Sequence, residues 1–157
     1  MRLTTLTLAM TLAAGTAFAN PVVPGDVTYT EYGAVEASLS GAAGDAAEGA
    51  KVVSTRSMGN CVACHQVSAL DAAFQGNVGP SLDGVGDRWN EAELRGIVAD
   101  AKMTYEGTMM PSFYKTTGYI RPGDAYTGKA AKGELEPLLS AQQIEDVVAF
   151  LMTLKTQ

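Results

Sequence analysis

The sequence has very few residues from which a metal site could be built. Its 157 residues include one histidine and two cysteines. A structural zinc site normally uses four ligands of these types, so these three side chains cannot complete one. A site with two histidine ligands from this chain is excluded as well, because there is no second histidine. What the chain can do therefore depends on where those three side chains stand.

Positive charge and long apolar runs are also scarce. Eleven Lys and Arg stand against seventeen Asp and Glu, which gives a formal net charge of −6. An acidic chain is a poor ligand for nucleic acid or for anionic membranes, but it suits a partner with a partly basic surface. No stretch approaches the roughly twenty apolar residues of a membrane-spanning helix. We therefore expect no nucleic acid partner and no membrane span.

Residues 1–19 have the layout of a secretory signal peptide. Arg2 supplies a short basic start, and an apolar, threonine-rich run extends from Leu3 to Ala14. The sequence Ala17-Phe18-Ala19 then fits an A-x-A cleavage site. We expect cleavage after Ala19 and export, which in a bacterium means a periplasmic protein.

Strand-like alternation and βαβ patterns are missing, which leaves helices. Residues 20–44, rich in Gly, Ala, Pro and Ser, are predicted to be an N-terminal extension, either disordered or a strap on the domain or a partner. Residues 45–157 are predicted to be one all-α domain with long loops. Helices are expected over 45–58, after the N-cap Asn90, and after Ser140. The last has a capping box and an apolar stripe of Ile144, Val147, Val148, Leu151 and Leu154.

All three scarce residues fall in one motif, Cys61-Val62-Ala63-Cys64-His65. C-x-x-C-H is the attachment pattern of c-type haem, in which two thiols add to the porphyrin vinyl groups and the histidine binds the iron. The motif could instead hold a redox dithiol, half of a zinc site or a structural disulfide. The adjacent His65 and the absence of a βαβ pattern favour one covalently attached haem c. Electron transfer is then the leading function.

The other face of the iron needs a different kind of ligand, and methionine is the candidate. Met58 is too close to the motif, Met152 lies inside a predicted helix, and Met103 could line the pocket. The pair Met109 and Met110 lies in a flexible loop, and Met110 is preferred because it precedes the stiffening Pro111. Methionine with histidine is a known cytochrome c pairing. Lysine or an open position stays as an alternative. Two protein ligands suit electron transfer rather than the binding of oxygen or peroxide.

Segments beyond the motif carry a resemblance to a known family. Gly79-Pro80-Ser81-Leu82-Asp83-Gly84 is typical of class I c-type cytochromes. Closer matches are Arg88-Trp89, Met110-Pro111-Ser112-Phe113-Tyr114 and the run Glu145 to Leu151. In these the chain resembles the SoxX family, the small cytochrome subunits of the bacterial SoxAX sulfur-oxidising complex. Gly118 to Leu139 departs from the family pattern, because it is longer and more polar than expected.

The resemblance implies a site and partners. It implies a class I cytochrome c-like fold with thioether links at Cys61 and Cys64, His65 and Met110 as iron ligands, and the Pro80 carbonyl as acceptor for the His65 ring N–H. Trp89 would pack near the porphyrin edge or in the core. It also implies a heterodimer with a SoxA-type haem subunit that joins thiosulfate to a cysteine of the SoxYZ carrier. This chain would accept the electrons and pass them to a downstream cytochrome c, with no catalytic residue of its own.

Two other functions stay open on the sequence. One is a free-standing class I cytochrome c shuttle with no role in sulfur oxidation. The other is a thiol–disulfide oxidoreductase, which would show two titratable thiols and no chromophore.

Overall fold

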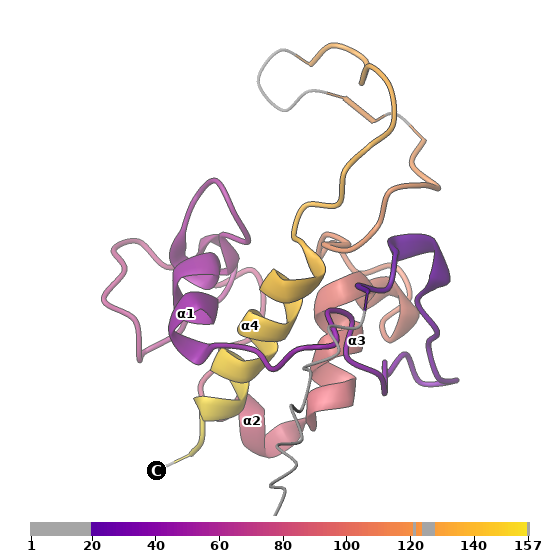
Figure 1. Cartoon of the computed structure of the whole chain (residues 1–157). Coiled ribbons are helices and arrows are strands. Elements are labelled where there is room, and N and C mark those ends of the chain that lie inside the picture. The colour runs from indigo at the N-terminus through magenta and orange to yellow at the C-terminus, as the bar shows by residue number, and fades with distance from the viewer. Residues whose placement is uncertain (1–19, 121, 124–127, 157) are drawn as a thin grey trace, which may run out of the picture.

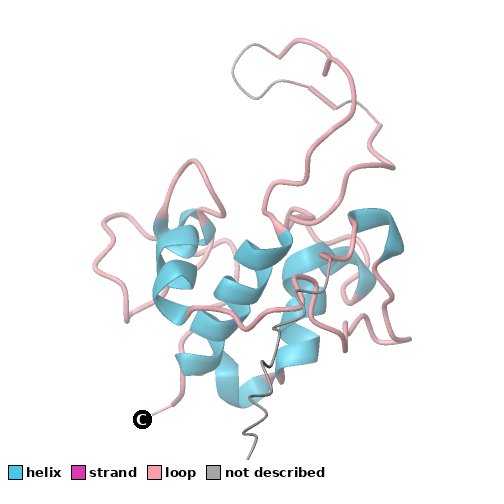
Figure 2. Ribbon diagram, viewed as in Figure 1, coloured by secondary structure: helices cyan, strands magenta, loops and turns pink. Residues whose placement is uncertain are grey.

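The computed structural model describes residues 20–120, 122–123 and 128–156, and the expected signal peptide lies outside these ranges. Within these ranges, four α-helices follow one another: α1 (Ala46–Ser54), α2 (Val85–Arg88), α3 (Glu91–Asp100) and α4 (Ala141–Thr153). Three 3-10 turns are interspersed, at η1 (Pro24–Asp26), η2 (Cys61–Ala63) and η3 (Ala101–Met103). The described residues form no strand, only an isolated bridge between Gly123 and Ala130. Figure 2 shows short helices joined by long loops, which confirms the predicted all-α class.

The predicted N-cap at Asn90 and the predicted capping box at Ser140 are both present, and Asn90 forms a capping box as well. The Asn90 side chain accepts from the Glu93 amide while the Glu93 carboxylate accepts from the Asn90 amide, and Ser140 and Gln143 do the same for α4. The first helix is shorter than the predicted 45–58, because Thr55 turns to an extended conformation at φ −86° and ψ 123°. The four-residue helix α2 was not among the expected helices, since it is too short to show a helical period.

The core forms where α1 crosses α4. Gly49 makes the close approach possible, because a Cβ added there would lie 1.9 Å from the Asp146 carbonyl oxygen. Apolar residues from both helices then fill the centre, notably Val52, Val53, Ile144, Val147, Val148 and Leu151. Helix α3 packs on the other side of α4, so the C-terminal helix lies between the other two (Figure 1).

The N-terminal extension lies on the domain as a strap. Val35 and Leu39 are buried, and the Val35 amide donates to the Ala92 carbonyl on α3 at 2.9 Å. The strap is also held by a buried ion pair. Arg95 on α3 donates to the Val35 carbonyl, while the Leu39 amide donates to the Glu145 carboxylate on α4. Of the predicted alternatives for this extension, the structure shows a strap on its own domain.

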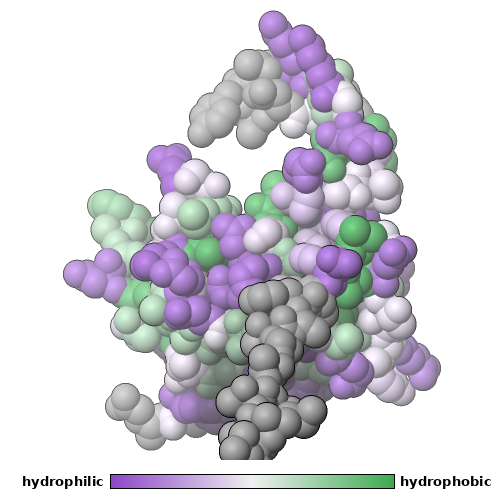
Figure 3. Space-filling view, viewed as in Figure 1, coloured by the Kyte–Doolittle hydropathy of each residue, from purple (hydrophilic) through white to green (hydrophobic). Residues whose placement is uncertain are grey.

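The described parts of one segment, 116–120, 122–123 and 128–138, rise away from the helices (Figure 1). Ile120 is 98% exposed there, and the Ala131 amide donates to the Pro122 carbonyl. Figure 3 shows hydrophilic side chains gathered at the upper end of this projection. Within the described ranges, no helix has the length and hydropathy to cross a membrane.

Candidate functional site

The C-x-x-C-H motif forms a tight turn that follows α1 along the chain, after the connecting residues 55–60. Asn60 adopts a left-handed conformation at φ 48°, and the chain then enters η2 at Cys61. The amides of Cys64 and His65 both donate to the Cys61 carbonyl, at 3.0 and 2.9 Å. The turn therefore brings two thiols and an imidazole together within five residues.

The cysteines are not joined to each other, and they differ in burial. Cys64 is exposed, whereas Cys61 is half-buried and packs against the core. Burial raises the pKa of the Cys61 thiol to about 11. Thiol–disulfide oxidoreductases depend on an accessible thiolate with a lowered pKa, usually at the first cysteine of the motif. A buried Cys61 with a raised pKa therefore disfavours that alternative.

The His65 ring is fixed by a hydrogen bond that sets its tautomer. Its Nδ1 lies 2.7 Å from the carbonyl oxygen of Pro80. A carbonyl oxygen can only accept, so Nδ1 carries the proton and donates it. The other nitrogen, Nε2, then presents a lone pair, which is the form that binds a metal ion. This is the contact with Pro80 that the family resemblance implies.

Gly79 lets the chain pass directly against this imidazole. A Cβ added at Gly79 would lie 2.3 Å from His65 Cε1 and 2.6 Å from Nδ1, which no real contact allows. The Gly79 amide also donates to the Cys64 carbonyl at 2.8 Å. The imidazole is therefore held by the hydrogen bond from its Nδ1 to the Pro80 carbonyl and by the backbone of Gly79 beside its ring.

The side chain of Gln75, which the sequence analysis did not identify, holds the loop between His65 and Gly79. The Gln75 amide oxygen accepts from the Val67 amide at 2.6 Å, and its nitrogen donates to the carbonyls of Val67 and Leu70. The Gly76 amide donates to the Val62 carbonyl within the motif. Glutamine in a loop gives no sequence signal for such a role, because the bonds exist only once the loop has closed.

The structure separates the methionines by their surroundings. Met110 is half-buried and packs against the core, whereas Met109 beside it is 80% exposed. Met58 and Met103 are about half exposed, and Met152 lies partly buried within α4. The Met110 backbone is held in place, since its carbonyl accepts from Lys102 Nζ at 2.6 Å. These surroundings favour Met110 over Met109.

The loop that carries Met110 is tied to the end of α3 through Asp100. This buried carboxylate accepts from the Ser112 hydroxyl at 2.7 Å and lies 3.5 Å from Lys115 Nζ. The Tyr114 amide donates to the Ala99 carbonyl at 3.0 Å. Sequence reasoning identified neither Asp100 nor Lys102, because their partners lie far enough along the chain to need the fold.

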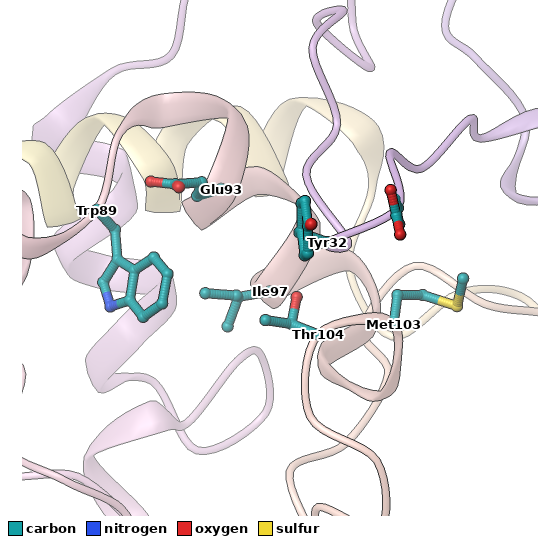
Figure 4. A pocket seen from close by; sticks show the side chains of 7 residues that line it. Tyr32, Trp89, Glu93, Ile97, Met103 and Thr104 are labelled. Atoms are coloured by element: carbon teal, nitrogen blue, oxygen red, sulfur yellow. The ribbon is translucent and has the colours of Figure 1, made fainter.

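Trp89 lies at the edge of the core and lines a cavity of about 300 Å³ (Figure 4). Its ring meets that of Tyr105 edge to face, with the centroids 6.4 Å apart. Ile97 and Met103 also line this cavity, and Glu31 and Tyr32 reach it from the strap. Trp89 therefore packs on the core, one of its two predicted surroundings, and its place near the porphyrin edge stays a prediction.

The residues of the site fit a covalently attached haem. Two thiols stand in the attachment spacing, the imidazole has a free Nε2, and a thioether is held at the domain surface by a tethered loop. Among the described residues, the motif included, no group of three or more His, Cys, Asp or Glu could hold a metal ion by itself. The donor set therefore suits an iron porphyrin better than a bare metal ion.

Comparison with known proteins agrees with this donor set. The cytochrome c family matches residues 46–155. The crystal structure of SoxXA from P. pantotrophus contains a chain that is 60% identical, with a TM-score of 0.84, and the match covers 87% of this chain and 100% of that one. No curated protein matches the chain.

The chain therefore belongs to the cytochrome c family. Within that family it is a class I cytochrome of the SoxX type. Membership implies covalently bound haem c, and the likeness to SoxXA links the chain to a sulfur-oxidising enzyme complex.

Proposed function

We propose that this chain is the electron-transfer subunit of a periplasmic heterodimer with a SoxA-type haem subunit. The single observation that carries the proposal is the likeness to a chain of SoxXA over the whole of that chain. The His65 geometry supports it from the site, because a histidine with a fixed tautomer is suited to permanent iron ligation. The expected signal peptide, residues 1–19, is part of this proposal, since it provides for export.

Each site residue then has a definite task. Cys61 and Cys64 would hold one haem c through thioether bonds, and His65 Nε2 would bind the iron. The Pro80 carbonyl keeps the proton on Nδ1, and Gly79 leaves room for the ring beside it. Met110 would supply a thioether as a further iron ligand, and methionine ligation raises the reduction potential. The bound haem supplies a centre that takes up and releases one electron at a time.

The reaction itself belongs to the partner. Joining the thiosulfate sulfur to a carrier cysteine forms a sulfur–sulfur bond and releases the thiol proton and two electrons. In the proposed complex the thiosulfate is joined to the SoxYZ carrier at the SoxA-type subunit. This chain would receive the electrons singly and pass them to a downstream cytochrome c. It contributes no nucleophile, since both of its cysteines are used in attachment. The whole complex is then an L-cysteine S-thiosulfotransferase.

A pull-down from periplasm tests the proposal, with mass measurement of both the chain and its partner. We expect the mass of the chain cleaved after Ala19 plus one haem, in a 1:1 complex with a second haem protein. A stable monomer that exchanges electrons fully without a partner would favour the free-standing shuttle. A colourless chain of bare polypeptide mass, from cells that mature c-type cytochromes, would rule out both.

A further inference from the structure

The segment that carries the attachment motif has few charged side chains of its own, although Asp83 and Arg88 from the next segment hydrogen-bond to its Ser68 and Ser81. Residues 57–82 contain no lysine or arginine and one carboxylate, Asp71, in a chain that carries eleven basic and seventeen acidic residues. Large apolar side chains are nevertheless exposed there. Met58 is 44% exposed, Phe74 101% and Val78 63%, and Met109 beside the proposed ligand is 80% exposed. Apolar exposure combined with a lack of charge is typical of the core of a protein–protein interface.

Phe74 is the most unusual of these residues. Its backbone has φ 59°, in the left-handed region that bulky residues rarely adopt. Its side chain gains no burial within the chain in return, because it is fully exposed. Strained positions that the local packing does not explain are frequently functional.

The loop around Phe74 is nevertheless well held. Gln75, the next residue, makes three hydrogen bonds to loop backbone, and Gly76 is bonded to the Val62 carbonyl. A Cβ added at Gly76 would lie 2.1 Å from the Ala63 carbonyl oxygen, so the loop presses directly on the motif. This loop forms the left-hand edge of the molecule in Figure 1, where Figure 3 shows green side chains. Phe74 is thus presented by a braced loop, which lowers the entropy lost on binding.

We propose that Phe74 anchors the docking surface for the second haem subunit, by entering an apolar recess on that subunit next to the proposed haem of this chain. The inference rests on the proposed function and adds the surface through which the heterodimer forms. Aromatic residues carry a disproportionate share of binding energy in interfaces. A segment with so few charged side chains suits a partner that stays bound, since transient electron carriers rely on charge to steer repeated encounters.

The projecting segment provides a matched control. Ile120 is 98% exposed, as Phe74 is, but it stands on a segment that also carries Lys132, Glu134 and Glu136. Both side chains can be shortened without opening a cavity. A difference between the two variants therefore reports on binding and not on folding.

The experiment measures the affinity of the haem-loaded chain for the purified SoxA-type subunit by titration calorimetry. Phe74→Ser should weaken binding by about tenfold to a hundredfold, while Ile120→Ser should bind like the wild type. Phe74→Leu should recover part of the loss. Phe74→Gly should bind weakly yet unfold at a higher temperature than the wild type, because glycine relieves the positive φ. The haem spectrum and reduction potential should be unchanged in all four free proteins.

Two results would contradict the proposed docking surface while leaving the proposed heterodimer in place. One is a Phe74→Ser protein that binds the partner as the wild type does, and the other is a loss of binding confined to Ile120→Ser. A wild-type chain that binds no second haem subunit would instead overturn the proposed heterodimer, and the docking surface with it.

Discussion

Arg95 on α3 and Glu145 on α4 form a buried ion pair, in which one nitrogen of Arg95 contacts both carboxylate oxygens. Arg95 Nε lies 3.0 and 3.1 Å from the two carboxylate oxygens, and the side chains are 7% and 5% exposed. Each partner also binds the strap, through the Val35 carbonyl and the Leu39 amide. One pair of side chains therefore fastens three separate segments of the chain.

Removing one member of this pair should be costly. Arg95→Ala leaves the Glu145 carboxylate buried without its counter-charge, so we expect a loss of about 3–5 kcal/mol in the free energy of unfolding. Glu91→Ala is the control, because Glu91 is exposed and lies 3.9 Å from the same guanidinium. Its removal should cost no more than about 0.5 kcal/mol. Urea unfolding of the haem-loaded proteins makes the comparison, and equal losses would contradict it.

Gly49 should tolerate no side chain at the crossing of α1 and α4. A Cβ there would lie 1.9 Å from the Asp146 carbonyl oxygen, so Gly49→Ala must push the helices apart. We expect a cost of about 1–3 kcal/mol or more, in spite of the better helix propensity of alanine. Gly25→Ala meets no atom within 4 Å and should be nearly neutral. A Gly49→Ala protein as stable as the wild type would show that the crossing is not close-packed.

Gly79→Ala should disturb the imidazole. The added Cβ would lie 2.3 Å from His65 Cε1, so the ring must move away from the Pro80 carbonyl or the loop must open. We expect a lower thermal unfolding temperature together with a changed absorption spectrum of the haem-loaded protein. An unaltered spectrum would mean that the proposed ligand does not depend on this close contact.

Met110→Ala should remove the proposed methionine ligand of the haem iron. The weak near-infrared absorption band from sulfur-to-iron bonding should vanish and the reduction potential should fall, because methionine ligation raises it. Met109→Ala is the natural control, since Met109 is 80% exposed and should leave both properties unchanged. If the band is lost in Met109→Ala and kept in Met110→Ala, the ligand assignment is wrong.

Tyr29 should make stability fall at alkaline pH. Burial, followed by the charge of Asp100, raises the pKa of this phenol from its ordinary value of 10.0 to about 12. The unfolded chain therefore loses the proton first as pH rises from 10 to about 12, and the folded state becomes less stable across that window. Tyr29→Phe should show a shallower decline, measured by urea unfolding at several pH values. Tyr32→Phe, at an exposed site, should follow the wild type.

Much of the fold was predictable because its signals are local. The boxes at Asn90 and Ser140 and the apolar stripe of α4 depend on residues within a few positions of one another. Helix α2 was not predictable, because a helix of four residues is too short to show a periodic pattern of apolar side chains. The early end of α1 was not predictable either, because Thr55 takes an extended conformation where the chain turns toward Cys61. The strap could not be distinguished from a disordered segment, because its partners Ala92 and Glu145 lie far along the chain.

The candidate site likewise contains residues that could be predicted from the sequence and residues that could not. Cys61, Cys64 and His65 follow from one contiguous motif, and Met110 from its place before Pro111 together with the family resemblance, while Pro80 came from the resemblance alone. The roles of these five residues stay predictions. The residues that hold the site, such as Gln75, Asp100 and Lys102, have no pattern of their own. Their bonds depend on loops that close only in the folded chain.

The strap has a consequence for the order in which the molecule is assembled. Leu39 leaves the ribosome well before Glu145, its partner 106 positions further along, has been made. The contact between the strap and α4 can thus form only after the final helix exists. Until then the strap can pack only against α3, where the Val35 amide meets the Ala92 carbonyl.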